Sequence, residues 1–202
     1  MRCQDCDYGF VSELASDRRK HRRYHDRLLF GLKRRAITEV HAVWQADAGA
    51  VRVVNARSPL AHRRIAEEVS LIAAGEVDFS FVAFSAVEQE SERDYHIFLG
   101  TQLERAVCYI MLERRSHVWR CTWTEYDSRT VHEVSDLGSV WSVSFAWVSR
   151  AKRRQGWARR SLEAATQYLD FPWAHLGWHT PFSPAGEALA RHLCPDGILI
   201  AK

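Results

Sequence analysis

The sequence lacks any run of about 18 consecutive apolar residues, and this absence argues against a membrane-spanning helix. The segment from Met1 to Cys6 also lacks the hydrophobic stretch that is typical of a secretory signal. We therefore expect a protein with no membrane partner that works in the cytoplasm, or in the nucleus if its source is eukaryotic.

The sequence also has little net charge and few cysteines. Its formal net charge of +3 is too small by itself to argue for a nucleic-acid partner. Its five cysteines are an odd number in a chain without an export signal, which argues against a disulfide framework. Apolar side chains, in contrast, make up 47% of the 202 residues. This composition suits one domain of ordinary size with a small appendage.

Two of the cysteines stand near two histidines at a spacing that predicts a zinc site. Cys3, Cys6, His21 and His25 form the pattern C-x2-C-x14-H-x3-H. Two thiolates on a tight turn and two imidazoles one helical turn apart can converge on Zn²⁺ as a tetrahedron. We expect a small ββα-like finger that holds a structural zinc ion. Three further side chains, Tyr8, Phe10 and Leu14, are expected to supply an apolar core beside the metal.

The helix expected over Asp17 to His25 carries five basic side chains besides the ligands. A weak contact with a nucleic-acid backbone is therefore conceivable, but a lone finger reads only about three base pairs. We favour a docking or structural role for the finger and keep weak nucleic-acid contact as the alternative.

A second pattern lies late in the chain, between an expected strand and an expected helix. Val140 to Val148 is rich in β-branched and aromatic residues, and Ser161 to Leu169 has helical apolar spacing. Between them lies R-x-x-G-x-A, here called the Gly156 turn (residues 153–158). Glycine allows close approach to the backbone, and the first amides of a helix attract anions. The turn, with Arg153, Arg154 and Arg159, thus predicts a pyrophosphate site.

The order of the remaining elements predicts a mixed α/β (α+β) fold with a mainly antiparallel sheet flanked by helices. The absence of Gly-x-Gly-x-x-Gly argues against a doubly wound nucleotide-binding fold. Ser58-Pro59 starts a helix that stops at Gly75. A meander then follows, and the chain ends strand, helix, strand. The meander strands are Phe79 to Phe84, His96 to Leu99, Arg105 to Leu112 and His117 to Trp123; the last elements are Ala174 to Trp178, Ser183 to Arg191 and Gly197 to Ala201.

The longest irregular stretch, Thr124 to Gly138, is rich in acidic residues. Either it borders a cleft that binds an amine or it is an exposed loop. Its titratable residues are Glu125, Asp127, His132, Glu133 and Asp136.

The Gly156 turn resembles the coenzyme A loop of GNAT-superfamily N-acetyltransferases, which has the pattern Q/R-x-x-G-x-G/A. A Cys2His2 finger before such a domain resembles the sister-chromatid cohesion acetyltransferases, which acetylate lysines on a cohesin subunit. The family pattern S-x-I-W-V-x4-R-R-x3-A-x-R is similar to residues 144–160 of this sequence, where Ala146 stands in place of the isoleucine. The matching residues are Ser144, Trp147, Val148, Arg153, Arg154, Ala158 and Arg160.

The resemblance implies a finger over residues 1–30 and a GNAT-like domain over residues 31–202, with acetyl-CoA as co-substrate and Zn²⁺ as a structural ion. It implies that acetyl-CoA is bound by the end of the strand and by the turn. The expected cofactor-binding residues are Trp147, Val148, Arg153, Arg154, Gln155, Gly156, Trp157, Ala158 and Arg159.

The expected chemistry is direct transfer to a primary amine within one ternary complex, which requires a base for the ammonium proton. The resemblance places Glu163 near the active site and makes it the leading base. It also implies a catalytic aspartate where this chain has Thr180, whose hydroxyl is no proton acceptor near neutral pH. His179 is the second candidate base. Ser144 is expected to orient the amine or a water molecule.

Three acceptors or roles stay open. A protein lysine is the first expectation, because the finger adds surface for a macromolecular partner. A small amine, of the aminoglycoside or polyamine kind, is the alternative within enzymes. A DNA-binding regulator with a non-catalytic acyltransferase shell is the alternative outside them, and the sequence leaves the oligomeric state open.

Overall fold

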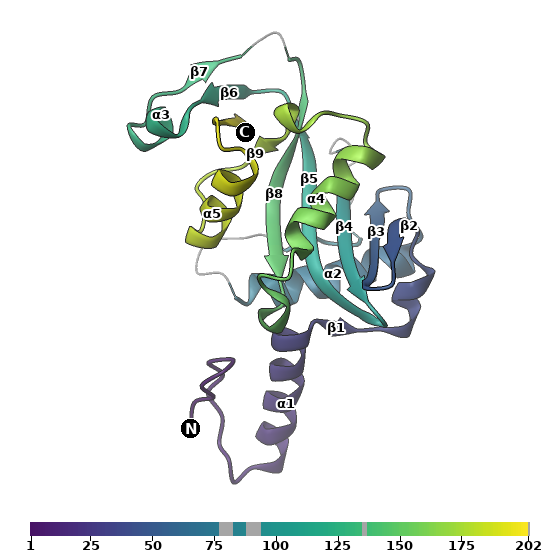
Figure 1. Ribbon diagram of the computed structural model, residues 1–202. Coiled ribbons are helices and arrows are strands. Elements are labelled where there is room, and N and C mark those ends of the chain that lie inside the picture. The colour runs from purple at the N-terminus through teal and green to yellow at the C-terminus, as the bar shows by residue number, and fades with distance from the viewer. Residues whose placement is uncertain (77–82, 88–93, 135–136, 202) are drawn as a thin grey trace.

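The computed structural model describes residues 1–76, 83–87, 94–134 and 137–201, and it is built around one mixed sheet (Figure 1). The strand order is β2-β3-β4-β5-β8-β9-β10-β6-β7, and β1 pairs with β5. Neighbouring strands are antiparallel except β8 with β9 and β9 with β10. The expected mixed, mainly antiparallel fold is confirmed.

The elements have the following bounds. The strands are β1 (Leu32–Lys33), β2 (Ala42–Ala46), β3 (Gly49–Asn55), β4 (Tyr95–Gln102), β5 (Arg105–Arg115), β6 (Val118–Cys121), β7 (His132–Glu133), β8 (Val140–Val148), β9 (Gly177–Trp178) and β10 (Ile198–Ala201). The α-helices are α1 (Ala15–Phe30), α2 (Leu60–Ala74), α3 (Trp123–Asp127), α4 (Trp157–Tyr168) and α5 (Pro184–Leu193). Short 3₁₀ turns are η1 (Arg35–Glu39), η2 (Arg150–Lys152) and η3 (Trp173–His175).

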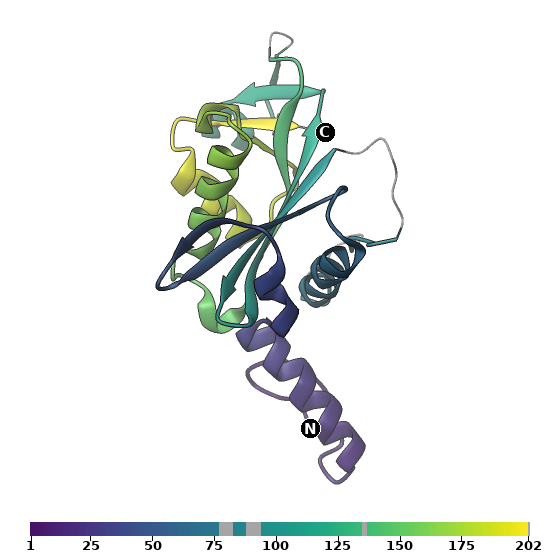
Figure 2. The same ribbon diagram turned by 90° about the vertical axis from the view of Figure 1, so that its right-hand side faces the viewer.

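Helices cover both faces of the sheet, and each face has its own core. Helices α4 and α5 lie on one face and α2 on the other (Figure 2). Leu162 of α4 is buried against Ile110 of β5 in the first core, and Val69 of α2 lies with Ile97 of β4 in the second. Because the central strands are covered on both faces, they are apolar on both, as is typical of a buried strand.

Helix α1 extends away from the body of the molecule, and the amino-terminal segment folds back along it (Figure 1). Its last turns are anchored on the body of the molecule. Leu28 is fully buried, and Arg105 of β5 contacts both the Asp26 carboxylate at 3.0 Å and the Gly31 carbonyl at 2.9 Å. Among the described residues, none of the helices combines the length and the apolar character that crossing a bilayer requires.

The strand expected at residues 117–123 does not continue a meander. Strand β6 pairs with β10 and β7 instead of β5. The reason is that β8, which is apolar on both faces, pairs with that edge of β5. The whole of β8 takes part, from Val148 beside Cys108 to Val140 beside Arg115. The expected strand residues 79–82 and the acidic residue Asp136 lie outside the described residues.

Helix α2 ends before Gly75, as predicted, but the prediction that Ser58 is its N-cap is wrong. The helix begins at Leu60 with Pro59 as N-cap, so Ser58 does not cap it. The Ser58 hydroxyl instead accepts a hydrogen bond from the Asn55 amide at 3.0 Å, which closes the turn after β3.

Candidate functional site

Strand β8 carries a β-bulge at Ser144. Val143 pairs with Leu112 of β5 and Phe145 with Met111, so Ser144 is the extra residue. Its hydroxyl donates to the Met111 carbonyl at 3.2 Å. Bulges re-aim the side chains of a strand and are enriched beside active sites.

The bulge reverses which residues of β8 face which core. Before it, Trp141 and Val143 point to the α4 side; after it, Phe145 and Trp147 point to the α2 side. An unbroken strand would place Val143 and Phe145 on one face, because successive side chains alternate. Trp147 is therefore buried on the far side of the sheet from α4. On the α4 side the strand presents the small, exposed Ala146.

Strands β8 and β9 part immediately beside this bulge. Their pairing covers Ser142 with Gly177 and Val143 with Trp178, and it ends with a hydrogen bond of 3.0 Å from the His179 amide to the Val143 carbonyl. Beyond that point β8 continues to Val148 without β9 beside it. This fork brings His179, whose side chain is exposed, next to Ser144, and Thr180 follows half-buried.

The Gly156 turn lies where β8 leads into α4, with a short η2 turn between them. Arg154 and Gly156 both have left-handed backbone angles, with φ of 62° and 79°. Within the described part of the chain, the main-chain N–H groups of residues 154–159 donate to no protein acceptor. Such consecutive free amides at a helix start form an anion-binding concavity.

The space in front of Gly156 is open. A Cβ built on this residue would meet only the end of the Arg160 side chain, at 3.9 Å. Packing therefore does not require glycine here. The positive φ favours it, and so does free access to the amides.

The side chains of the turn have different surroundings. Trp157 is buried, and Gly49 and Gly100 allow its ring to pack there, because a Cβ on either would meet it at 2.8 Å and 3.0 Å. Arg153 donates to the Val148 carbonyl at 3.1 Å and to a carboxylate at Glu76. Gln155 is exposed and donates to the Ala151 carbonyl at 2.9 Å, Arg154 is exposed, and Ala158 is half-buried.

Glu163 lies on α4 with its side chain 40% exposed. Its carboxylate forms an ion pair of 2.7 Å with Arg159, one helical turn earlier. Within the described residues it has no hydrogen bond or ion pair with Ser144 or His179. The structure thus places the backbones of Ser144 and His179 side by side at the fork and leaves Glu163 paired on the helix. The catalytic role of each stays a prediction.

Sequence reasoning missed Glu76, a carboxylate with only 10% of its side chain exposed. It accepts hydrogen bonds from Trp147 Nε1 at 2.7 Å, Arg150 Nε at 2.7 Å and Arg153 Nη2 at 2.6 Å. These donors come from β8, η2 and the Gly156 turn. No local pattern marks Glu76, because a glutamate after a helix-ending glycine is usually solvated.

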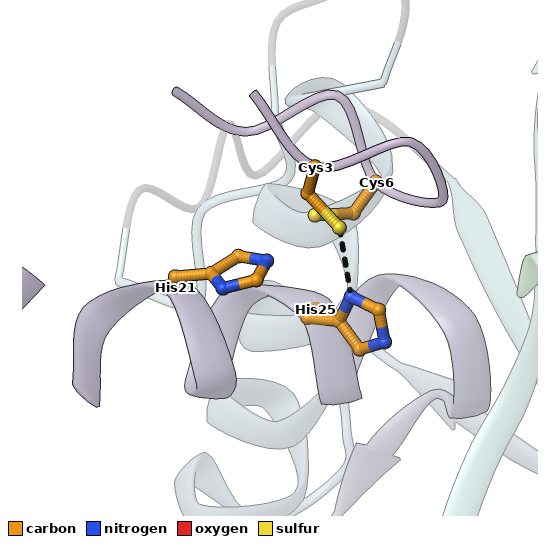
Figure 3. Close-up of side chains that lie close together, drawn as sticks. All are labelled: Cys3, Cys6, His21 and His25. Atoms are coloured by element: carbon orange, nitrogen blue, oxygen red, sulfur yellow. Dashed lines mark hydrogen bonds between the residues drawn. The ribbon is translucent and has the colours of Figure 1, made fainter. Parts of the chain in front are cut away.

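The four expected metal ligands converge in the amino-terminal segment (Figure 3). One ligand atom of each lies within 4.8 Å of all the others, and Cys3 Sγ is 3.5 Å from His25 Nδ1. His21 Nε2 is buried without a hydrogen-bond partner. A buried, unpartnered imidazole nitrogen beside two thiols suits a tetrahedral zinc ion, so the residues fit the metal.

Local contacts support the same interpretation. Main-chain hydrogen bonds from Cys6 and Asp5 lower the pKa of the Cys3 thiol to about 6, whereas burial raises the pKa of Cys6. The His21 ring stacks on Phe10 with centroids 4.1 Å apart. Leu14, expected in the small core, is 52% exposed instead and stands at the N-cap position of α1.

A separate open cavity of about 590 Å³ lies on the other side of β9 from the bulge. Its walls come from β6, β10, η3 and the end of α5, and no residue of β8 or of the Gly156 turn lines it. Glu125 and His132 of the expected acidic stretch do line it. Glu125, however, is already used by the capping box with Thr122 and by a contact of 3.1 Å with His132.

No family model matches the sequence, and no curated protein matches it. The structure, in contrast, matches solved structures, and two of these are of an acetyltransferase domain. One is the xEco2 acetyltransferase domain bound to a K105-CoA conjugate, with a TM-score of 0.62 and 17% identity over 80% of this chain and 96% of that one. The other is the same xEco2 domain, with a TM-score of 0.58 and 17% identity over 80% and 95%. This chain therefore has the fold of an acetyltransferase domain, as its sequence predicts.

Proposed function

We propose that this chain is an acetyl-CoA-dependent N-acetyltransferase that acts on a primary amine, with a protein lysine as the acceptor. The observation that carries the proposal is the row of free amides at residues 154–159, which lies directly after a bulged and forked strand. The free amides suit the diphosphate of acetyl-CoA, and the open edge of the forked strand suits its thioester. The fold shared with the xEco2 acetyltransferase domain supports the assignment of both features to one cofactor.

The diphosphate of acetyl-CoA binds the amides of the Gly156 turn, where the positive end of the α4 dipole favours an anion. Arg154 and Arg159 lie at the same helix start and add charge. Arg153 and Trp157 contribute by holding the turn, because their side chains are engaged within the protein. The acetyl end of the cofactor follows the open edge of β8 past Val148 and Ala146 towards the fork.

At the fork, the neutral amine attacks the thioester carbonyl carbon. A new C–N bond forms, the C–S bond breaks, and CoA leaves as a thiolate that takes up a proton. A main-chain N–H of β8 near Trp147 and Val148 stabilises the oxyanion. The bulge is suited to this, because it changes the orientation of the backbone at Ser144.

A base must first remove the proton of the ammonium group. The position of His179 beside Ser144 favours the imidazole for this role. Glu163 is the base that the family resemblance favours, and its ion pair with Arg159 leaves it less suited. The zinc ion, held by Cys3, Cys6, His21 and His25, has a structural role and supports the finger.

The finger and helix α1 extend away from the body of the molecule and add surface for a partner (Figure 1). This arrangement favours a macromolecular acceptor over a small amine. The finger helix also exposes Arg19, Lys20, Arg22 and Arg23, which have no ion pair within the described residues. This basic face favours a weak nucleic-acid contact as a second property of the finger. Binding to DNA that weakens steeply with salt would support it.

The deciding experiment is incubation of the purified chain and labelled acetyl-CoA with cell lysate. Label in a macromolecular fraction supports a protein acceptor, and label in small molecules supports a small amine such as a polyamine. Absence of product together with absence of CoA binding removes the enzyme proposal. It leaves a DNA-binding regulator with an acyltransferase shell.

A further inference from the structure

Glu76 joins three consecutive segments that form the proposed cofactor site. Its carboxylate accepts from the end of β8 through Trp147, from η2 through Arg150 and from the Gly156 turn through Arg153. The Glu76 side chain is 10% exposed, whereas that of Arg153 is 48% exposed, so the carboxylate itself is largely shielded from water and its bond to Arg153 lies at the surface. The carboxylate between the two guanidinium groups offsets their mutual repulsion.

Arg150 also reaches the zinc finger. Its Nη1 donates to the main-chain carbonyl of Asp5, which lies between the ligands Cys3 and Cys6. One guanidinium therefore touches both the metal-binding knuckle and the carboxylate that holds the turn. The amide of Ser149, just before Arg150, donates to the Val107 carbonyl at 2.9 Å and fixes this segment on β5.

We propose that Glu76 is a positioning residue for the acetyl-CoA site, and that through Arg150 it couples zinc binding in the finger to cofactor binding. This inference rests on the function proposed above. The reason is geometric: the amides of residues 154–159 can converge on a diphosphate only while the turn keeps its shape. The turn is anchored through Arg153 on Glu76, and Arg150 shares that anchor with the finger.

Coupling of this kind must be reciprocal. If bound zinc strengthens CoA binding by some factor, bound CoA strengthens zinc binding by the same factor. A factor that differs from one shows that the two sites are coupled, and a factor of one shows that they bind independently.

The first experiment measures binding of CoA to the zinc-loaded full chain by titration calorimetry. Glu76→Gln keeps the shape of the side chain and removes its charge, and we expect about tenfold weaker CoA binding, the size typical of lost charge-assisted hydrogen bonds. Glu68→Gln is the matched control. It lies on α2 and breaks a more exposed ion pair, with Arg34, that includes no residue of the Gly156 turn, so CoA binding should stay unchanged.

The second experiment measures zinc affinity by competition with a chelator, with and without CoA. In the wild-type chain we expect CoA to tighten zinc binding severalfold. Arg150→Lys should abolish this factor, because a lysine cannot donate to Asp5 and Glu76 through two separate nitrogens. This variant also decides the matter if Glu76→Gln fails to fold, as judged by circular dichroism.

The outcomes separate the two proposals. Wild-type CoA binding that Glu76→Gln leaves unchanged overturns the positioning role and leaves the proposed function standing. A zinc affinity that is indifferent to CoA in the wild-type chain overturns the link to the finger. A wild-type chain that does not bind CoA at all overturns the proposed function and, with it, this inference.

Discussion

The finger and the Gly156 turn are both expected to bind a charged partner, but the finger would do so through side chains and the turn through main-chain amides. The finger presents four side chains at a spacing that is visible in the sequence. The turn presents main-chain amides whose number and direction depend on the backbone of residues 154–159. A side-chain site can be recognised from residue identity, whereas a main-chain site depends on what holds the loop.

Loss of the metal should have the largest effect on stability, and this effect should be confined to the finger. Cys6→Ser removes a buried ligand, and structural zinc contributes on the order of 10 kcal/mol to such modules. We expect zinc content to fall from one ion per chain to none and α1 to lose helicity towards its start. Zinc analysis and circular dichroism measure both.

The matched control for that change is Cys121→Ser, since Cys121 is buried in the sheet and is no metal ligand. Full zinc content should persist in it. A Cys6→Ser chain that still binds one tightly held zinc ion would contradict the four-ligand site.

The turn should be broken next most severely by a side chain at Gly156. Gly156→Val strains a residue at φ 79° and places methyl groups over the free amides. We expect CoA binding to weaken by about a hundredfold, which corresponds to about 2.7 kcal/mol. Titration calorimetry with CoA measures it.

Gly138→Val controls for backbone strain alone, because Gly138 also has a positive φ, of 59°, in open space. Its CoA affinity should match that of the wild-type chain. Equal losses in the two variants would show that strain, and not occlusion of the amides, explains the result.

A third test compares the fork with the turn, since chemistry and cofactor binding should separate. His179→Gln should lower kcat by about a hundredfold and leave CoA affinity unchanged, as expected for a lost general base. Steady-state kinetics with acetyl-CoA and an amine acceptor measure this. His175→Gln, an exposed histidine on η3, is the control.

Glu163→Gln in the same assay arbitrates between the two candidate bases. This variant should change kcat little, because Glu163 lies in an exposed ion pair with Arg159, which contributes only about 0.3 to 0.5 kcal/mol to stability. A large fall in kcat for Glu163→Gln with none for His179→Gln would reverse the assignment.

The smallest expected effect is on the stability of the sheet, which leads through β8 into the Gly156 turn. Burial lowers the pKa of His96, and its Nδ1 is shielded without a hydrogen-bond partner. Below the ordinary pKa of about 6.5, the unfolded chain takes up a proton that the folded chain resists, so stability falls as pH drops.

Urea unfolding at about pH 7.5 and about pH 5.5 measures this difference, and His96→Phe should reduce it by about 1 kcal/mol or less. Because His96 lies in β4 and not in the finger, zinc content should stay the same in this variant at the higher pH. An undiminished loss of stability in His96→Phe would assign the acid sensitivity to other groups.

Much of the fold could be predicted from the sequence, because strong local patterns coincide with real elements. The strand Val140–Val148 has its predicted bounds, and α5 and β10 lie where the sequence placed them. The pairing of β6 was missed, since four residues fit several sheet edges equally well. The start of α2 was misassigned because a serine before a proline can cap a helix or close a turn.

The candidate site divides in the same way. The zinc ligands, the Gly156 turn, Ser144 and His179 were all named from sequence. The bulge at Ser144 was not, because it arises from the register of β8 against Met111 and Leu112. Nothing near Glu76 in the sequence indicates that two arginines and a tryptophan more than 70 residues later would bind it.

By itself, then, the sequence determined the expected ligand set of the finger, the position of the glycine in the expected anion site, and the alternation of apolar strands and helices. Each depends on residue type and short spacing. Tertiary structure alone decided which amides are left free, where β8 and β9 part, and which buried carboxylate holds the turn, because these depend on contacts between segments far apart in the chain.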